Sequence, residues 1–78
     1  MKLNVKYFGM IAEWAGSENG QLDFSGTNVA QLRNQIEKLI PGLNRASYQI
    51  AVNHVIVADD AVITLGDDIA ILPPFAGG

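Results

Sequence analysis

Hydrophobic and polar residues alternate along the first stretch of the chain. Leu3, Val5 and Tyr7 are apolar, and the residues between them are polar. A period of two residues is typical of a strand with one buried face. Phe8 falls on the polar side of this alternation. We therefore expect it to face solvent at the point where the strand ends.

Two short elements are predicted after this strand. Helix-forming residues lie between glycines in residues 9–16, which predicts a helix of about two turns. We interpret Trp14 in this helix as a core residue rather than a binding residue. Residues 17–20 are turn-forming, and residues 21–24 alternate again. They predict a second strand that forms a hairpin with the first.

The clearest element is an amphipathic helix that begins after Asn28. Asn28 is followed three residues later by Gln31, the pattern of a capping box. Pro41-Gly42 ends the helical pattern. One apolar face predicts packing against one sheet. Its members recur at helical spacing and are Val29, Leu32, Ile36, Leu39 and Ile40.

Three further strands are predicted in the second half of the chain. Residues 48–52 and 55–57 flank Asn53-His54, and asparagine tolerates the positive φ of a tight turn. Residues 69–72 form the last strand, which runs directly into two prolines. The order is therefore two strands, a helix and three strands. One helix must cover one face of a mixed sheet.

This order predicts an α+β fold of the β-grasp type, with a mixed sheet of four to five strands. We divide the chain into a β-grasp domain, residues 1–72, and an extended C-terminal diglycine tail, residues 73–78. Strand parity directs Phe8, Ile56 and Leu72 away from the helix. An exposed apolar patch beside a protruding segment usually marks a partner surface. We predict that these three residues dock a partner; the alternative is that they are scattered and unrelated.

Composition limits the function classes. The chain has 78 residues, 49% of them hydrophobic, and a net charge of −3, which indicates one compact domain with little room for an internal active site. It has no cysteine, so it can form neither a disulfide nor a thiolate zinc site. Its five Lys and Arg form no basic stripe, which argues against nucleic acid. Without a signal peptide pattern or a membrane-length apolar run, we expect a cytoplasmic protein that does not enter the membrane.

The titratable residues offer no convincing catalytic or metal site. His54 is the only histidine and lies in a predicted turn, so we interpret it as a turn residue rather than a general base or ligand. Two acidic pairs, Asp59-Asp60 and Asp67-Asp68, are interpreted as solvated turns rather than a divalent cation site. We therefore predict no metal site.

The C-terminal segment has the most distinctive chemistry, in the sequence Pro73-Pro74-Phe75-Ala76-Gly77-Gly78. The prolines fix φ and lack an N–H, so sheet pairing should end there. The phenylalanine offers one large apolar group, and the two glycines suit a channel too narrow for side chains. Fully extended, the four residues after the prolines would reach roughly 13 to 14 Å, deep enough for another protein's active site. A frayed terminus is the alternative.

Several motifs together resemble a known family. They are Tyr7-Phe8-Gly9, residues 12–16, the helix start at 28–33, residues 50–53 and 65–70, and the ending Pro73-Pro74-Phe75-Ala76-Gly77-Gly78. The last is the most specific, since a diglycine follows Pro-Pro-x-x at the end of a chain of this strand order. The chain resembles the small sulfur-carrier subunit of molybdopterin synthase, the MoaD-like branch of the ubiquitin-like β-grasp proteins. One departure is Ala12, where the family usually has a basic residue that can touch a partner.

The resemblance implies a non-catalytic carrier subunit that binds no cofactor. An adenylating enzyme of the ubiquitin-activating type would use ATP to adenylate Gly78, and a sulfur donor would convert it to a thiocarboxylate. The tail would then enter the large subunit of molybdopterin synthase, which holds the catalytic residues, and give its sulfur to cyclic pyranopterin monophosphate to build the molybdopterin dithiolene. Gly77 and Ala76 would thread the channel, and Phe75 would anchor near its mouth.

Two alternatives remain open from the sequence. The same carrier chemistry serves thiamine, cysteine or tRNA thiolation. A ubiquitin-like modifier, by contrast, uses a diglycine end to form isopeptide bonds with lysines. The state in which Gly78 is recovered, thiocarboxylate or isopeptide, distinguishes the modifier from the carriers.

Overall fold

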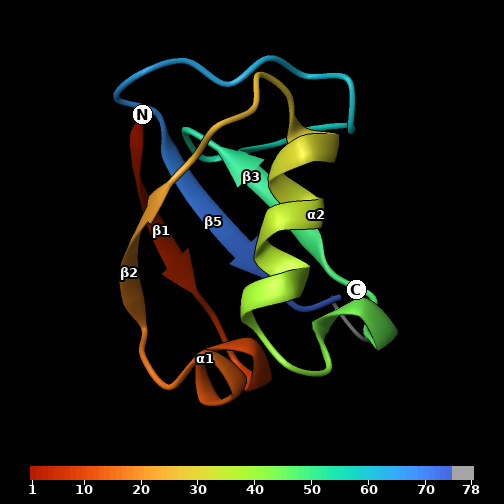
Figure 1. The fold of residues 1–78 in the computed structure, drawn as a ribbon. Helices are drawn as coiled ribbons and strands as arrows, with labels where there is room; N and C mark the ends of the chain where they lie inside the picture. Colours follow the sequence, from red (N-terminus) through yellow and green to blue (C-terminus); the bar gives the residue numbers. More distant parts are fainter. Residues whose placement is uncertain (75–78) are drawn as a thin grey trace.

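The computed structural model describes residues 1–74. Its strands form one five-stranded sheet in the order β2-β1-β5-β3-β4, and the longer helix crosses one face of it (Figure 1). This is the predicted β-grasp arrangement. The elements in chain order are β1 (Lys2–Tyr7), α1 (Met10–Ala15), β2 (Asn19–Asp23), α2 (Val29–Leu39), a 3-10 turn (Leu43–Arg45), β3 (Gln49–Val52), β4 (Val55–Ile56) and β5 (Asp68–Leu72).

The first and last strands lie side by side in the sheet. β1 pairs with β5 in parallel, whereas β2 pairs antiparallel with β1, and β3 pairs antiparallel with both β5 and β4. Both β1 and β5 point toward the end of the molecule that holds α1 (Figure 1). Residues 8–9, which follow β1, and Pro73, which follows β5, therefore lie at one end of the sheet.

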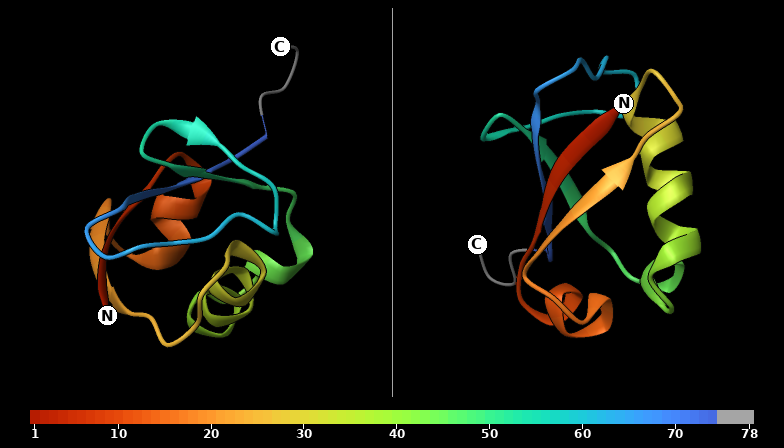
Figure 2. Two further views of the ribbon diagram at one scale, coloured as in Figure 1. Left: turned by 90° about the horizontal axis from the view of Figure 1, so that it is seen from above. Right: turned by 60° about the vertical axis from the view of Figure 1, so that its left-hand side comes forward.

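The core lies between the sheet and α2, on the face that strand parity predicts. In the side view of Figure 2, α2 lies on one face of the sheet, and among residues 1–74 no helix covers the other. The sheet contributes alternate residues of three strands, and α2 contributes residues at helical spacing. The fully buried members from these elements are Leu3, Val5, Ile50, Ile69, Ile71, Val29, Leu32 and Ile36.

The start of α2 confirms the predicted capping box. The Asn28 side chain accepts a hydrogen bond from the Gln31 backbone N–H at 2.9 Å, and the Gln31 side chain accepts one from the Asn28 N–H at 3.2 Å. These two bonds satisfy donors that the first helical turn leaves free. The helix ends at Leu39, just before Pro41-Gly42.

Two core predictions are wrong. Trp14 is 40% exposed, because a helix as short as α1 meets the core along one line, and Ile11 and Ala15 occupy it. Leu39 is 59% exposed, because Ile40, the C-cap residue, turns into the core in its place and is only 3% exposed.

Some strand bounds also differ from the predicted ones: β2 begins at Asn19, β3 begins at Gln49, and β4 ends at Ile56.

The turn between β3 and β4 is the tight reversal that the sequence predicts. Asn53 and His54 have φ of 52° and 71°, as hairpin turns with two positive φ angles require. The Asn53 side chain also donates to the Asp67 carboxylate at 2.9 Å and accepts from the Asp68 N–H at 3.0 Å. It therefore ties this turn to the loop that leads into β5.

One carboxylate of each acidic pair, Asp59 and Asp67, serves local structure. Asp67 accepts a hydrogen bond from the Thr64 N–H at 2.8 Å, and this bond, with that from Asn53, lowers the pKa of the Asp67 carboxyl. Asp59 forms an ion pair with Arg33 of α2 at 3.0 Å. In the described part of the chain, no three acidic or histidine side chains are placed to hold a metal ion.

No helix among residues 1–74 is both long enough and apolar enough to cross a membrane.

Candidate functional site

The outer face, defined here as the face of the sheet opposite α2, carries a row of side chains across four strands. Lys6 pairs with Ala70, Ala70 with Ala51, and Ala51 with Ile56. Directly opposite residues of paired strands share a face. Because Ala70 lies between two buried isoleucines of β5, this row points away from the core.

The predicted docking residues all belong to this face. The Phe8 N–H donates to the Ile71 carbonyl at 3.2 Å and so continues the β1–β5 pairing, which places Phe8 beside Leu72. Phe8 is 43% exposed, Ile56 is 49% exposed and Leu72 is half-buried. Phe8 and Leu72 are neighbours, whereas two alanines separate them from Ile56. We call Phe8, Ile56 and Leu72 the docking surface; its docking role stays a prediction.

A small cavity opens on the same face. This cavity, beside Phe8, has a volume of about 130 Å³. The polar depression over β2 and β1 is larger, at about 360 Å³. The smaller cavity is lined by Lys6, Phe8, His54, Asp68, Ile69 and Ala70. His54 was expected only to form a turn. No sequence signal shows that this turn brings it close to Phe8.

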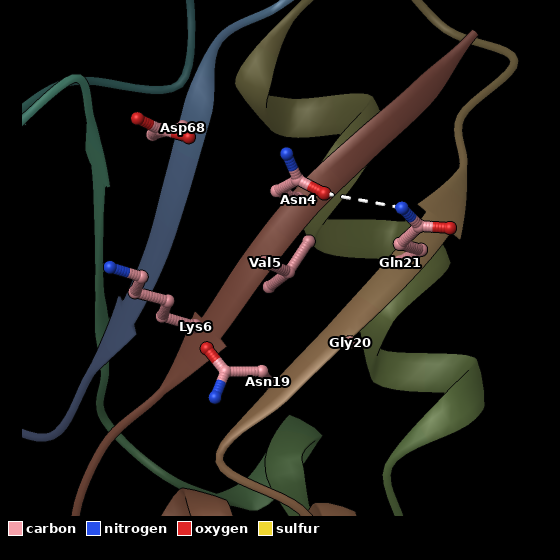
Figure 3. A pocket seen from close by; sticks show the side chains of 7 residues that line it. All are labelled: Asn4, Val5, Lys6, Asn19, Gly20, Gln21 and Asp68. Atoms are coloured by element: carbon pink, nitrogen blue, oxygen red, sulfur yellow. Dashed lines mark hydrogen bonds between the residues drawn. The ribbon is translucent and has the colours of Figure 1, made fainter.

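The outer face over β2 and β1 is polar. Figure 3 shows the depression there, and in it the Gln21 side chain donates to Asn4 at 3.4 Å. Lys6 and Asp68 stand between this polar part and the docking surface. The apolar part of the outer face thus lies over β5, β3 and β4. It is also the part that adjoins the end of β5.

The root of the predicted tail packs against the residue that precedes α1. Gly9 has φ of 59°, and a Cβ on it would lie 3.2 Å from the Pro73 Cγ. A side chain at Gly9 would therefore be strained and would press on the proline ring. Pro73 is half-buried and Pro74 is exposed. Pro73 therefore lies beside the Phe8-Gly9 segment.

A groove between α1 and the end of β1 borders the docking surface. It has a volume of about 450 Å³, and its lining includes Phe8, Ala12, Glu13 and Glu18. Ala12, the position of the departure from the family pattern, is therefore part of the wall of this groove. Tyr7 also lines it, and burial raises the pKa of the Tyr7 phenol.

The predicted reacting and threading residues lie outside the described residues. These are Phe75, Ala76, Gly77 and Gly78. Of the predicted tail, the structure describes Pro73 and Pro74, which follow the last residue of β5. Within residues 1–74, the candidate site therefore consists of the outer face and the tail root.

Comparisons with known proteins agree on one family. The model of the ThiS family matches residues 5–78. A Mycobacterium tuberculosis protein named molybdopterin synthase sulfur carrier subunit is 35% identical, covering 100% of this chain and 99% of that protein. A Pyrococcus furiosus structure, described as putative molybdopterin converting factor, subunit 1, is 27% identical with a TM-score of 0.86, covering 96% of this chain and 99% of that one. A structure of the complex of subunits 1 and 2 of molybdopterin-converting factor from Helicobacter pylori is 26% identical with a TM-score of 0.67, covering 100% of both chains.

Proposed function

The chain belongs to the ThiS family, and from this premise we propose that it is the sulfur-carrier subunit of molybdopterin synthase. The observation that carries the proposal is the whole-length likeness to a curated sulfur carrier subunit, in a chain whose last strand leads into Pro73-Pro74 and a diglycine. The apolar docking surface beside the tail root supports it, because a carrier must be recognised by the proteins that load and unload it.

The proposed reacting group is the Gly78 carboxylate. A free carboxylate is a poor electrophile, so an adenylating enzyme of the ubiquitin-activating type joins it to AMP from ATP and releases pyrophosphate. The terminal sulfur of a donor persulfide then attacks the acyl carbon and displaces AMP, which gives an acyl disulfide. A second thiol cleaves this disulfide by exchange, which releases the C-terminal thiocarboxylate and leaves the donor as a disulfide. Gly77 and Gly78 suit this chemistry, because a segment without side chains fits a narrow active-site channel.

The proposed acceptor is cyclic pyranopterin monophosphate, held by the large subunit of molybdopterin synthase. The docking surface binds that subunit, Phe75 anchors near the channel mouth, and the catalytic residues belong to the partner. The Helicobacter pylori complex supports this part, since a similar chain is there assembled with subunit 2. Phe8 and Leu72 lie immediately beside the tail root, so docking and insertion of the tail would occur together.

Mass spectrometry of the intact chain tests the chemistry. After incubation with the adenylating enzyme, ATP and a sulfur source, we expect the mass of one oxygen replaced by one sulfur. The loaded chain, mixed with the large subunit and cyclic pyranopterin monophosphate, should form the dithiolene product. An unchanged mass with a demonstrably active enzyme contradicts the proposal, and Gly78 recovered joined to lysines indicates a modifier.

A tail variant provides the matched control. Deleting Gly78 should abolish sulfur loading and leave the melting temperature unchanged, because the fold is built from residues before Pro73. Dithiolene formation by the deletion variant would show that the tail end is not the reacting element. If the loaded wild-type chain serves another acceptor instead, the carrier chemistry stands and the assignment to molybdopterin falls.

A further inference from the structure

The centre of the outer face is lower than its surroundings. Ala70 and Ala51 lie next to each other in the row across the sheet, between Lys6 on β1 and Ile56 on β4. Neighbouring strands stand only about 4.8 Å apart, so side chains on one face lie next to one another. Two methyl groups between longer side chains therefore leave a depression. Ala51 is 4% exposed and Ala70 is half-buried, and of the two it is Ala70 that lines the cavity beside Phe8.

The walls of this depression come from two elements distant in sequence. Phe8 closes one side and His54 another. The backbone beside His54 is held in place, since the Asn53 N–H donates to the Asp68 carbonyl at 2.8 Å and its side chain accepts from the Asp68 N–H at 3.0 Å. The backbone that carries His54 is therefore fixed relative to β5 in the free chain, and fixing part of a pocket in advance lowers the entropic cost of binding.

The lining indicates the kind of group that fits. Its two charged side chains, Lys6 and Asp68, have opposite signs. Their charges offset each other, so the lining does not favour a charged occupant. The remaining lining residues are Phe8, His54, Ile69 and Ala70, so the lining is mostly apolar. The cavity volume is about 130 Å³. A cavity of about 150 Å³ holds a benzene molecule in another protein, so this one suits a single large apolar side chain.

We propose that this cavity receives one large apolar side chain of the large subunit, with Ala70 as its floor and His54 as a wall. The inference rests on the proposed function. It assigns His54 and Ala70 to the interface, and it makes the cavity the central anchor point of the docking surface. A large side chain seated in a pocket at the middle of an interface is the usual form of a binding hot spot.

Filling the cavity tests the proposal. Ala70→Leu should project into it and weaken binding of the large subunit at least about tenfold, as measured by titration calorimetry. Ala58→Leu, the same change at an exposed residue of the loop after β4, should leave the affinity unchanged. His54→Asn should weaken binding while keeping the turn, because asparagine also tolerates positive φ. Melting temperatures of all three variants establish that they are folded.

The outcomes separate this inference from the proposed function. If Ala70→Leu binds as tightly as wild type while Leu72→Asp does not bind, the cavity proposal is overturned and the docking surface stands. If Ala70→Leu instead abolishes self-association of the free chain in sedimentation experiments, the occupant is a second copy, which also overturns it. If wild type does not bind the large subunit at all, the proposed function fails.

If wild type does not bind the large subunit, a measurement on the free chain still tests whether the cavity binds apolar groups. Phenol is titrated into the isotopically labelled protein, and backbone amide shifts are followed by NMR. Saturable shifts at Phe8, His54 and Ala70 that disappear in Ala70→Leu support an apolar binding cavity. Shifts of equal size in both proteins, or none in wild type, overturn it.

Discussion

Two neighbouring residues of β5 test which face of the sheet meets the partner. Ile71 is 0% exposed under α2, whereas Leu72 is half-buried on the outer face. Truncating a buried isoleucine costs about 2 to 5 kcal/mol, and Ile71→Asp also buries an unpaired carboxylate. A domain of this length has a total stability of about 4 to 12 kcal/mol. We therefore expect Ile71→Asp to unfold most of the protein.

Leu72→Asp should behave differently. Complete burial of a leucine contributes about 1.5 to 3 kcal/mol, so a half-buried one contributes about 1 kcal/mol. The melting temperature should then fall by only about 4 to 8 °C for a domain of this size. Loss of an interface anchor commonly costs 2 kcal/mol or more, so affinity for the large subunit should fall about thirtyfold.

Two measurements on both variants decide which face is which. Circular dichroism gives the melting temperature, and calorimetric titration gives the affinity for the partner. If Leu72→Asp unfolds the domain and Ile71→Asp does not, the assignment of the two faces is inverted. A folded Leu72→Asp variant that binds with wild-type affinity removes Leu72 from the docking surface.

Three further predictions concern stability. Asn28→Ala should cost about 0.5 to 2 kcal/mol in urea unfolding, because the capping box is lost. Gly9→Ala should lower the melting temperature more than Gly16→Ala: both glycines have positive φ, but only at Gly9 does a Cβ meet Pro73, while nothing lies within 4 Å at Gly16. The lowered pKa of Asp67 stabilises the fold above the pKa of an unfolded aspartate, and this contribution is lost as pH falls through the folded value. Stability measured against pH should therefore fall less steeply in acid for Asp67→Asn than for wild type.

The sequence by itself determined the elements and their inward faces. Alternation in β1 and β5 is a local property, since side chains two apart share a face whatever lies above it. Parity alone predicts Leu3 on the buried side and Leu72 on the outer side; Leu3 is buried, and so is Ile71, the residue before Leu72 on the opposite parity. The capping box is also local, because Asn28 and Gln31 need only one helical turn to meet. The fold class followed from the order of these elements.

Only the tertiary structure decided how far each face is covered. Trp14 and Leu39 have the right periodicity for burial, yet α1 and the end of α2 leave them exposed. Periodicity gives the direction of a side chain but not the extent of its neighbours. The cavity is a stronger case, because Phe8 and His54 meet only through the pairing of β1 with β5 and β5 with β3. Contacts between distant segments depend on strand order and register, and no local pattern in the chain encodes them.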